Sequence, residues 1–164
     1  MGLGKLLLQV YVTFPNIKKL VGVELSPSRY DLGADALRRL VSYNTEEYKI
    51  QKDSEKIVSI QDGNERLLEF REQNLFDCRE GLDEADIIIL ETHFPKSIWI
   101  RMSTYILGMK RGARLLTYEN LREVYSSYPE MPFEQIPLNV VPDDRFFTTW
   151  SVRRGHHFYC WVRK

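Results

Sequence analysis

The chain has 164 residues, 43% of them hydrophobic and 28% charged, and this length and composition predict one globular domain with a buried core. Its 23 basic residues balance its 23 acidic ones, so net charge predicts no strong binding to nucleic acid. The apolar runs at 6–10 and 87–90 fall short of the roughly 20 residues that span a bilayer, and no secretory leader is recognised, so we expect a protein of the nucleus or cytoplasm with no membrane partner.

The first half of the chain predicts alternating helices and strands. Residues 5–11 predict a helix entered from a glycine turn, and the apolar run 20–23 predicts a short buried strand. A helix is expected to start at Ser26, and residues 57–60 and 67–70, on either side of an Asp-Gly turn signal, predict a hairpin or strand pair. The apolar face of the helix is expected to consist of Leu32, Ala36, Leu37, Leu40 and Val41.

The second half continues the alternation and then changes character. Residues 85–90 predict a fully apolar strand, 97–107 a helix, and 114–118 another strand. A proline-rich segment then predicts a loop over the sheet, and residues 146–150 and 157–162 predict a closing hairpin.

These elements predict an α/β fold with a Rossmann-like, mostly parallel sheet and a C-terminal antiparallel hairpin. The sequence contains no internal repeat, no low-complexity tract and no long linker. A single domain covering residues 1–164 is therefore expected.

The cysteines and histidines do not predict a metal site. Cys78 and Cys160 lie far apart without CxxC spacing, which suits reduced thiols in an intracellular protein. The neighbours His156 and His157 point to opposite faces of a strand, so they do not chelate one metal ion.

A nucleotide site is predicted by a glycine turn and an acidic residue. Gly2, Gly4 and Lys5 stand at the entrance to the first helix, where glycine lets a ligand approach backbone N–H groups. Glu24 follows about 20 residues later, at the end of the next strand, where a carboxylate accepts hydrogen bonds from ribose hydroxyls. The alternatives are a flexible terminus for the glycines and, for Glu24, a solvated carboxylate capping the next helix.

Asn74 and Leu75 offer an amide for the edge of a purine and an apolar side chain for its face. An asparagine in a turn adopts the same position without any ligand. Both interpretations stay open for this pair.

Candidates for the acceptor side of a cleft follow the strongest strand of the sequence. Glu91, Thr92 and His93 come directly after it, and open α/β sheets bind ligands beyond the carboxyl ends of their strands. His93 is either a proton acceptor or, as we favour, a hydrogen-bonded loop residue. Trp150 and Tyr159 belong to an aromatic group that by default packs across strands, and a few of its members are candidates to line an acceptor channel.

Taken together, these residues resemble the class I S-adenosylmethionine-dependent methyltransferases. The likeness is greatest to the disruptor-of-telomeric-silencing family, the histone lysine N-methyltransferases that lack a SET domain. Residues 2–5 with the L-Q-V at 8–10 resemble the second half of the family's first motif, and residues 21–24 are similar to its ribose-binding strand. Residues 109–114 look like its M-K-x-G-x-R turn, and 149–151 with the Phe-Tyr pair before Cys160 resemble its closing strands.

The resemblance implies S-adenosylmethionine as the cofactor and a protein such as a histone as the methyl acceptor. It places the cofactor on Gly2, Gly4, Lys5, Glu24, Asn74 and Leu75. It places the acceptor against Glu91, Thr92, Trp150 and Tyr159.

Two features depart from the family. Residues 91–94 stand where the family has N-N-F, which changes the chemistry of the acceptor side. The family's first strand and the opening of its first motif have no counterpart here, so an N-terminally truncated domain is expected. The alternatives are a catalytically inactive cofactor-binding or structural relative and, from another class, a dinucleotide-dependent oxidoreductase.

Overall fold

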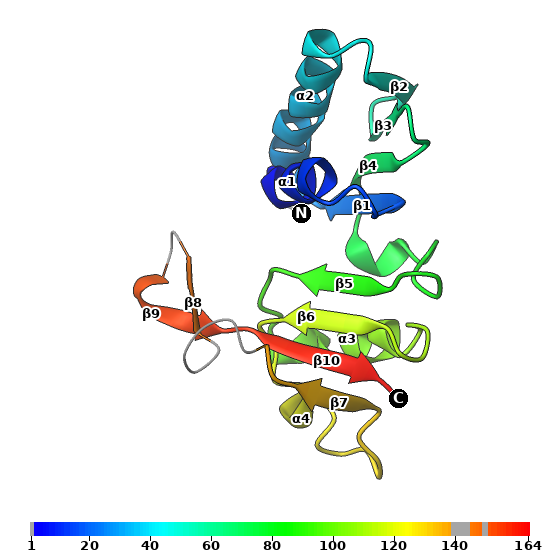
Figure 1. Cartoon of the computed structure of the whole chain (residues 1–164). Helices are drawn as coiled ribbons and strands as arrows, with labels where there is room; N and C mark the ends of the chain where they lie inside the picture. Colours follow the sequence, from blue (N-terminus) through cyan, green and yellow to red (C-terminus); the bar gives the residue numbers. More distant parts are fainter. Residues whose placement is uncertain (1, 139–144, 149–150) are drawn as a thin grey trace. The chain divides into compact units, whose positions relative to one another are not determined.

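The computed structural model describes residues 2–138, 145–148 and 151–164 (Figure 1). The chain divides into two compact units, unit 1 (Met1–Cys78) and unit 2 (Arg79–Lys164), and each is described by itself. The expectation of a single domain stays a prediction.

Unit 1 is a four-stranded mixed sheet with two helices. Its elements are α1 (Lys5–Thr13), β1 (Lys19–Glu24), α2 (Pro27–Tyr43), β2 (Tyr48–Asp53), β3 (Ile57–Asp62), β4 (Leu67–Glu72) and the 3-10 turn η1 (Leu75–Asp77). The strand order is β1-β4-β3-β2, with β1 and β4 parallel and the other pairs antiparallel. The expected strand pair is confirmed as β3 and β4.

Buried side chains from both helices and three strands form the core of unit 1. They are Tyr11, Tyr30, Ala34, Leu37, Tyr48, Val58, Ile60, Leu68 and Phe70. Alternate residues of a strand share one face, so the core residues of β3 and β4 all point toward the helices. The expected helix face was partly wrong, since Leu32 is 60% exposed and the buried stripe runs through Tyr30 and Ala34 instead.

A buried ion pair connects the end of α1 to the turn between β3 and β4. The Arg66 Nε donates to Asp62 Oδ2 at 2.6 Å, and the Arg66 Nη1 donates to the carbonyls of Tyr11 at 2.8 Å and Phe14 at 3.2 Å. Asp62 Oδ1 accepts the N–H groups of Asn64 and Arg66. Both side chains are at most 8% exposed, so each charge depends on the other for compensation.

The Asp62 carboxyl makes the stability of unit 1 sensitive to acid. Burial raises its pKa, but the N–H donors of Arg66 and Asn64 and the guanidinium charge outweigh this, so the pKa lies below its usual value. A carboxyl whose pKa is lower in the folded chain stabilises the fold above its unfolded pKa of about 3.9 and loses this contribution as pH falls through the folded value. We expect the stability difference between wild type and Asp62→Asn, measured by urea unfolding, to be large at about pH 7 and to shrink at about pH 3. A difference that is independent of pH would contradict this role.

Unit 2 contains a second four-stranded sheet and a two-stranded ribbon. Its elements are β5 (Ile87–Leu90), the 3-10 turn η2 (Lys96–Ile98), α3 (Trp99–Ile106), β6 (Arg114–Thr117), α4 (Leu121–Val124), β7 (Phe133–Ile136), β8 (Arg145–Thr148), β9 (Ser151–His157) and β10 (Tyr159–Arg163). The strand order is β5-β6-β10-β7, with β5 and β6 parallel and β10 antiparallel to both of its neighbours. β8 pairs with β9.

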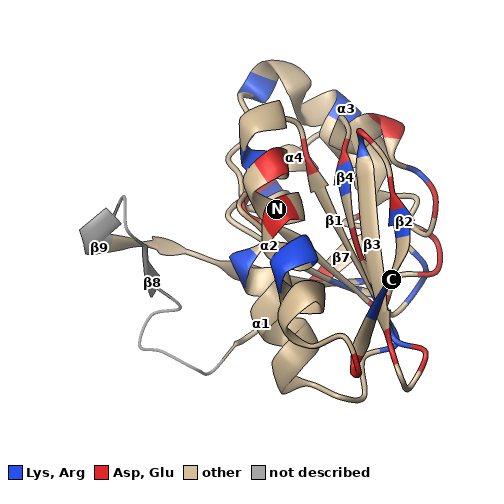
Figure 2. Ribbon diagram, turned by 90° about the horizontal axis from the view of Figure 1, so that it is seen from above, with Lys and Arg blue, Asp and Glu red and all other residues tan. Residues whose placement is uncertain are grey.

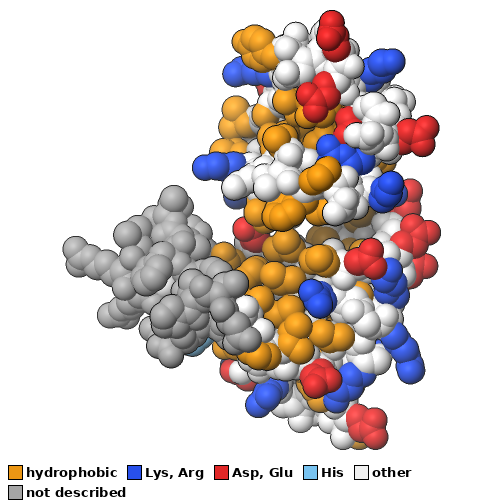
Figure 3. All heavy atoms as spheres, in the orientation of Figure 1, with side chains coloured by type: hydrophobic (Ala, Val, Ile, Leu, Met, Phe, Trp, Pro, Cys, Tyr) orange, Lys and Arg blue, Asp and Glu red, His pale blue; other side chains and the backbone are white. Residues whose placement is uncertain are grey.

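The two faces of the β5-β6-β10-β7 sheet differ. α3 and α4 lie behind it in Figure 1, and Met102, Ile106 and Leu115 are among the buried side chains of this unit. On the other face of β5, Ile87 is 55% and Ile89 is 41% exposed, and Figure 3 shows hydrophobic side chains gathered over β5, β6 and β10. No helix in the described part of the chain is long and apolar enough to cross a bilayer.

The expected Rossmann-like, mostly parallel sheet is wrong. Each of the two four-stranded sheets holds one parallel pair, β1–β4 or β5–β6, and its remaining pairs are antiparallel. In unit 1 the polar segment after α2 forms β2, an edge strand on which every side chain except Tyr48 is exposed. Edge strands are commonly polar, so this strand carries no apolar alternation to predict it.

The C-terminal strands also pair differently from the prediction. Residues 153–155, expected to separate two strands, lie within β9, which pairs with β8. β10 leaves this ribbon and lies between β6 and β7. β7 itself arises from the proline-rich segment that was expected to be a loop.

Candidate functional site

The Glu24 carboxylate is a buried charge at the carboxyl end of β1. Its side chain is 6% exposed. Oε2 accepts the Gly2 N–H at 2.8 Å, and Oε1 accepts the Ser26 N–H at 2.9 Å and the Arg29 Nη2 at 2.9 Å. The contact with Ser26 is the one expected for an acid at the start of a helix, but the carboxylate is buried rather than solvated.

These donors keep the Glu24 carboxylate ionised. Burial raises its pKa, but the hydrogen bonds from the Ser26 N–H and the Arg29 guanidinium lower it by more. The pKa therefore lies below the usual value. The side chain is therefore an acceptor of hydrogen bonds at neutral pH.

The glycine turn lies directly before α1. Gly4 is the N-cap of α1 with φ 74°, and a Cβ on it would overlap the ring of Phe70. Gly2 also has a positive φ of 56°, but a Cβ on it would meet nothing within 4 Å. Lys5 is the first residue of α1 and is exposed. The conformation needs glycine at both positions, and the packing needs it only at Gly4.

Asn74 lies at the same end of the sheet as Glu24 because β1 and β4 end together. Their register pairs Glu24 with Glu72, and the Gln73 N–H donates to the Glu24 carbonyl at 2.9 Å. Asn74 Oδ1 accepts the Phe76 N–H at 3.0 Å and caps η1. This is the contact expected for an asparagine that forms a turn without any ligand. The next residue, Leu75, is half-buried. Unit 1 thus brings Gly2, Glu24 and Asn74 to one end of the β1–β4 pair.

In unit 2, Glu119 joins the segments that follow β5 and β6. Its carboxylate is 8% exposed, and its Oε1 accepts the Phe94 N–H at 2.7 Å and lies 3.3 Å from His93 Nδ1. The Glu119 N–H donates to Thr117 Oγ1 at 3.2 Å. Thr117 therefore fixes the backbone of Glu119, while the segment after β5 contacts its carboxylate.

Aromatic rings gather next to this carboxylate. The Tyr118 ring lies 5.1 Å from His93, 5.8 Å from His156 and 5.1 Å from Phe158, measured between ring centroids. Burial raises the pKa of Tyr118, and the negative charge of Glu91 raises it further, so the phenol stays protonated at neutral pH. We call His93, Tyr118, Glu119, His156 and Phe158 the histidine cluster.

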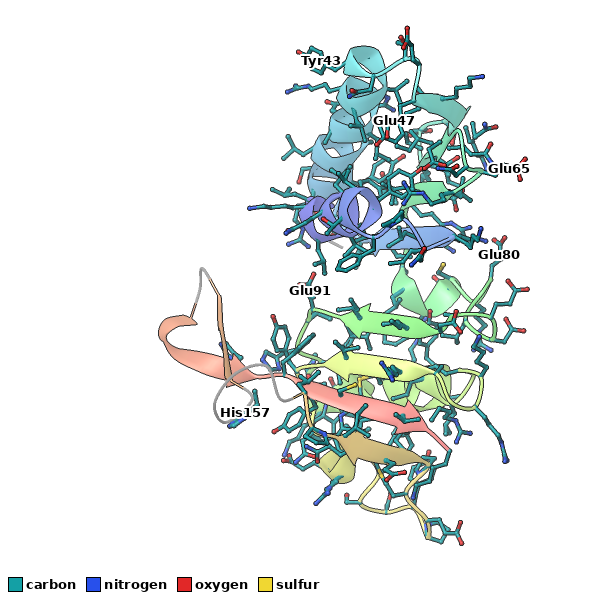
Figure 4. The ribbon with its side chains drawn as sticks, in the orientation of Figure 1. Tyr43, Glu47, Glu65, Glu80, Glu91 and His157 are labelled. Carbon is teal, nitrogen blue, oxygen red and sulfur yellow. The ribbon has the colours of Figure 1, made fainter. Side chains whose placement is uncertain are left out.

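The predicted acceptor residues only partly coincide with the histidine cluster. Glu91 is exposed at the carboxyl end of β5 (Figure 4), and its charge raises the pKa of Tyr118 in the histidine cluster. Thr92 is exposed and precedes His93 in the chain. The ring of Tyr159 packs instead against Trp161 and His157, each at 6.0 Å. Trp150 lies outside the described residues.

Sequence reasoning missed Glu119 and Tyr118. Their signal was present, because Tyr118 ends the predicted strand 114–118 and Glu119 directly follows it, as Glu91 follows 85–90. Polar side chains beyond the carboxyl ends of neighbouring parallel strands meet at one edge of a sheet, so the same rule would have selected both segments.

Two hollows of unit 2 lie elsewhere. The larger, about 500 Å³, is lined by Arg122, Tyr125, Tyr128, Met131, Phe133, Glu134, Gln135, Trp161 and Lys164. The smaller, about 190 Å³, is lined by Arg79, Leu82, Asp83, Thr104, Tyr105 and Gly108. Neither includes a predicted site residue.

Basic and acidic side chains are mixed on the outer elements of unit 1. Side chains of both signs occur on α2 and on the edge strand β2 (Figure 2). Within the ranges that the structure describes, no group of three or more His, Cys, Asp or Glu side chains is arranged to hold a metal ion.

Comparison of the sequence with models of known protein families gives no match, and comparison with curated proteins gives none either.

Proposed function

We propose that the chain is an S-adenosylmethionine-dependent methyltransferase that acts on a protein such as a histone. The observation that carries the proposal is the buried, ionised Glu24 at the end of β1, which is hydrogen-bonded to the Gly2 N–H of the glycine turn and lies at the same sheet end as Asn74. The combination of a glycine turn, an acid at a strand end and a neighbouring amide suits the adenosine part of a cofactor.

The donor set of unit 1 fits such a cofactor at specific atoms. A carboxylate oxygen accepts more than one hydrogen bond, so a ribose hydroxyl would share Glu24 Oε2 with the Gly2 N–H. The Asn74 Oδ1 is engaged with Phe76, which leaves its Nδ2 as the donor for a purine nitrogen. Gly4 and Lys5 would then support the turn rather than contact the cofactor.

The cofactor would supply an electrophilic methyl group. The protein's contribution is to align the acceptor with that methyl group and to exclude water from both.

The proposal predicts that binding of S-adenosylhomocysteine depends on the charge of Glu24. We expect the wild-type chain to bind it in a calorimeter and Glu24→Gln to weaken binding by about 10- to 100-fold, because a hydrogen bond to a charged acceptor contributes about 1.5–3 kcal/mol. Glu72→Gln is the matched control, since this acid stands opposite Glu24 in the register on β4 and is expected to leave the Kd within about twofold.

Thermal unfolding of both variants distinguishes lost binding from lost folding. No binding by the folded wild-type chain would contradict the proposal and favour a structural relative without catalysis. Binding of NAD in preference to S-adenosylhomocysteine would indicate the oxidoreductase alternative.

A further inference from the structure

The larger hollow of unit 2, of about 500 Å³, has a floor of aromatic rings. Tyr125, Phe133 and Trp161 are at most 3% exposed, and Tyr128 lines the same hollow with 41% of its surface exposed. The Tyr125 ring lies 4.8 Å from that of Tyr128 and 5.7 Å from that of Phe133, measured between centroids. The Tyr125 hydroxyl donates to the Ser103 carbonyl at 2.8 Å, which holds its ring in place. We call the four rings the aromatic floor.

The pairing of β10 with β7 assembles the aromatic floor. Their register sets Trp161 opposite Gln135 and Arg163 opposite Phe133. Opposite residues and residues two apart along a strand share one face, so these four side chains lie on the same face of the sheet. The Tyr125 ring contacts that of Phe133 from the end of α4. All the residues that line the hollow belong to unit 2, and none of them is a predicted cofactor residue.

The groups around the hollow offer more hydrogen-bond donors than acceptors. Among the residues that the structure describes, three buried side-chain nitrogen or oxygen atoms have no hydrogen-bond partner, and two of them are Trp161 Nε1 and Arg163 Nε. A buried donor without an acceptor destabilises a fold. On the exposed part of the lining, the cations Arg122 and Lys164 outnumber the carboxylate of Glu134. The hollow therefore favours a ligand that brings a negatively charged acceptor.

We propose that this hollow binds a small aromatic carboxylate. The ligand's ring would pack on the aromatic floor, since aromatic pairs prefer centroid separations of about 4.5–7 Å. Its carboxylate would pair with Lys164 and with Arg122, whose N–H groups match two carboxylate oxygens. One negative charge balances the excess of one positive charge in the lining, and the volume is usual for a small-molecule site. Binding here involves no residue of the proposed cofactor site and is independent of methyl transfer.

Four probes that each differ in one property separate the contributions of ring and charge. Phenylacetate carries both the ring and the negative charge, and we expect the full chain to bind it with a Kd on the order of 1 mM, as is ordinary for so small a ligand. Phenylacetamide lacks the charge and cyclohexylacetate lacks the aromatic ring, so each should bind about 3- to 10-fold more weakly. Phenethylamine carries a positive charge, and because aromatic rings also attract ammonium groups, it tests the sign. Equal binding of all four probes, or tighter binding of phenethylamine, would overturn the proposal.

The indole N–H of Trp161 reports where the probe binds. The chain has three tryptophans, and Trp99→Phe and Trp150→Phe assign their indole signals in ¹H–¹⁵N correlation spectra. Trp99 does not line the hollow, and its Nε1 donates to the Phe94 carbonyl at 2.9 Å, so its signal is the internal reference. Phenylacetate should shift the Trp161 signal until the site is saturated and leave that of Trp99 in place. A Trp161 signal that stays in place well above the expected Kd would overturn the proposal.

Arg122→Gln tests the pairing of the carboxylate. It should weaken binding of phenylacetate about 3- to 10-fold, since the guanidinium is exposed and water screens part of its charge, and leave binding of phenylacetamide unchanged. Arg111→Gln is the matched control, because this exposed arginine of unit 2 lines neither hollow. It should leave the Kd of both probes unchanged. Wild-type affinity for phenylacetate in Arg122→Gln would overturn the assignment of the charge.

Tyr128→Leu tests the requirement for a ring. The leucine keeps an apolar side chain at this exposed position, so thermal unfolding should stay close to that of the wild type. Binding of phenylacetate should weaken several-fold and approach that of cyclohexylacetate. Equal losses for phenylacetate and cyclohexylacetate would show that apolar contact alone holds the ligand and would overturn the preference for an aromatic one.

Discussion

Arg66→Leu is expected to lower the free energy of unfolding of the chain by about 3–5 kcal/mol, the usual effect of removing one partner of a buried ion pair. The leucine leaves the Asp62 carboxylate buried without its 2.6 Å partner. It also removes the donor to the carbonyls of Tyr11 and Phe14, which end α1. The guanidinium further loses its position 4.5 Å from the centre of the Tyr11 ring. Urea unfolding followed by far-ultraviolet circular dichroism measures the change.

The matched control is Arg38→Leu. Arg38 also pairs with carboxylates, Asp35 and Asp53, each at 2.8 Å, but all three side chains are 39–55% exposed. Exposed pairs contribute at most about 1 kcal/mol, because water screens the charges in both states. If Arg66→Leu lowered the free energy of unfolding no more than Arg38→Leu does, burial would not be what determines how much these ion pairs stabilise the fold.

Gly4→Ala is expected to destabilise the chain by about 2–5 kcal/mol. The left-handed conformation at φ 74° disfavours alanine by about 1–2 kcal/mol. In addition, the new Cβ would lie 2.5 Å from Phe70 Cζ, and relieving such an overlap in a packed core costs about 1–3 kcal/mol. Phe70 is completely buried, so its ring has little room to shift.

Gly2→Ala separates the two contributions. Gly2 has the same kind of backbone conformation, with φ 56°, but a Cβ there would meet nothing within 4 Å. Its substitution should cost only the conformational share of about 1–2 kcal/mol. Equal losses in the two variants would show that contact with Phe70 is not what requires glycine before α1. Urea unfolding of both variants under identical conditions makes the comparison.

The local elements of the fold were predictable, and their pairing was not. Apolar periodicity identified the strands now seen as β1, β5 and β6 and the first three helices, because burial of one face leaves a regular pattern in the sequence. Pairing is set by contacts between distant segments, for which no local pattern exists. β2 was missed because an exposed edge strand needs no apolar residues, and β10 was paired wrongly because its partners were β6 and β7 rather than its neighbour along the chain.

In the candidate site too, the position of a residue along the chain was predictable and its contacts were not. Glu24 was identified from its position after a strand, but its contacts with Gly2, Ser26 and Arg29 depend on how the chain folds back. His93 was judged a loop residue because a histidine beside a proline has no recognisable partner in the sequence. The partner, Glu119, lies 26 residues away and meets His93 only because β5 and β6 are parallel neighbours.

The position of β10 also sets the order in which the chain can fold during synthesis. All the strands of unit 1 lie within residues 19–72, so its sheet can close while later residues are still being added. In unit 2, β6 and β7 have no hydrogen-bonded strand between them until Tyr159–Arg163 has left the ribosome. The apolar side chains of β6 and β7 therefore stay without their central neighbour for the time needed to translate the intervening residues, which exposes unit 2 to aggregation for longer than the sheet of unit 1.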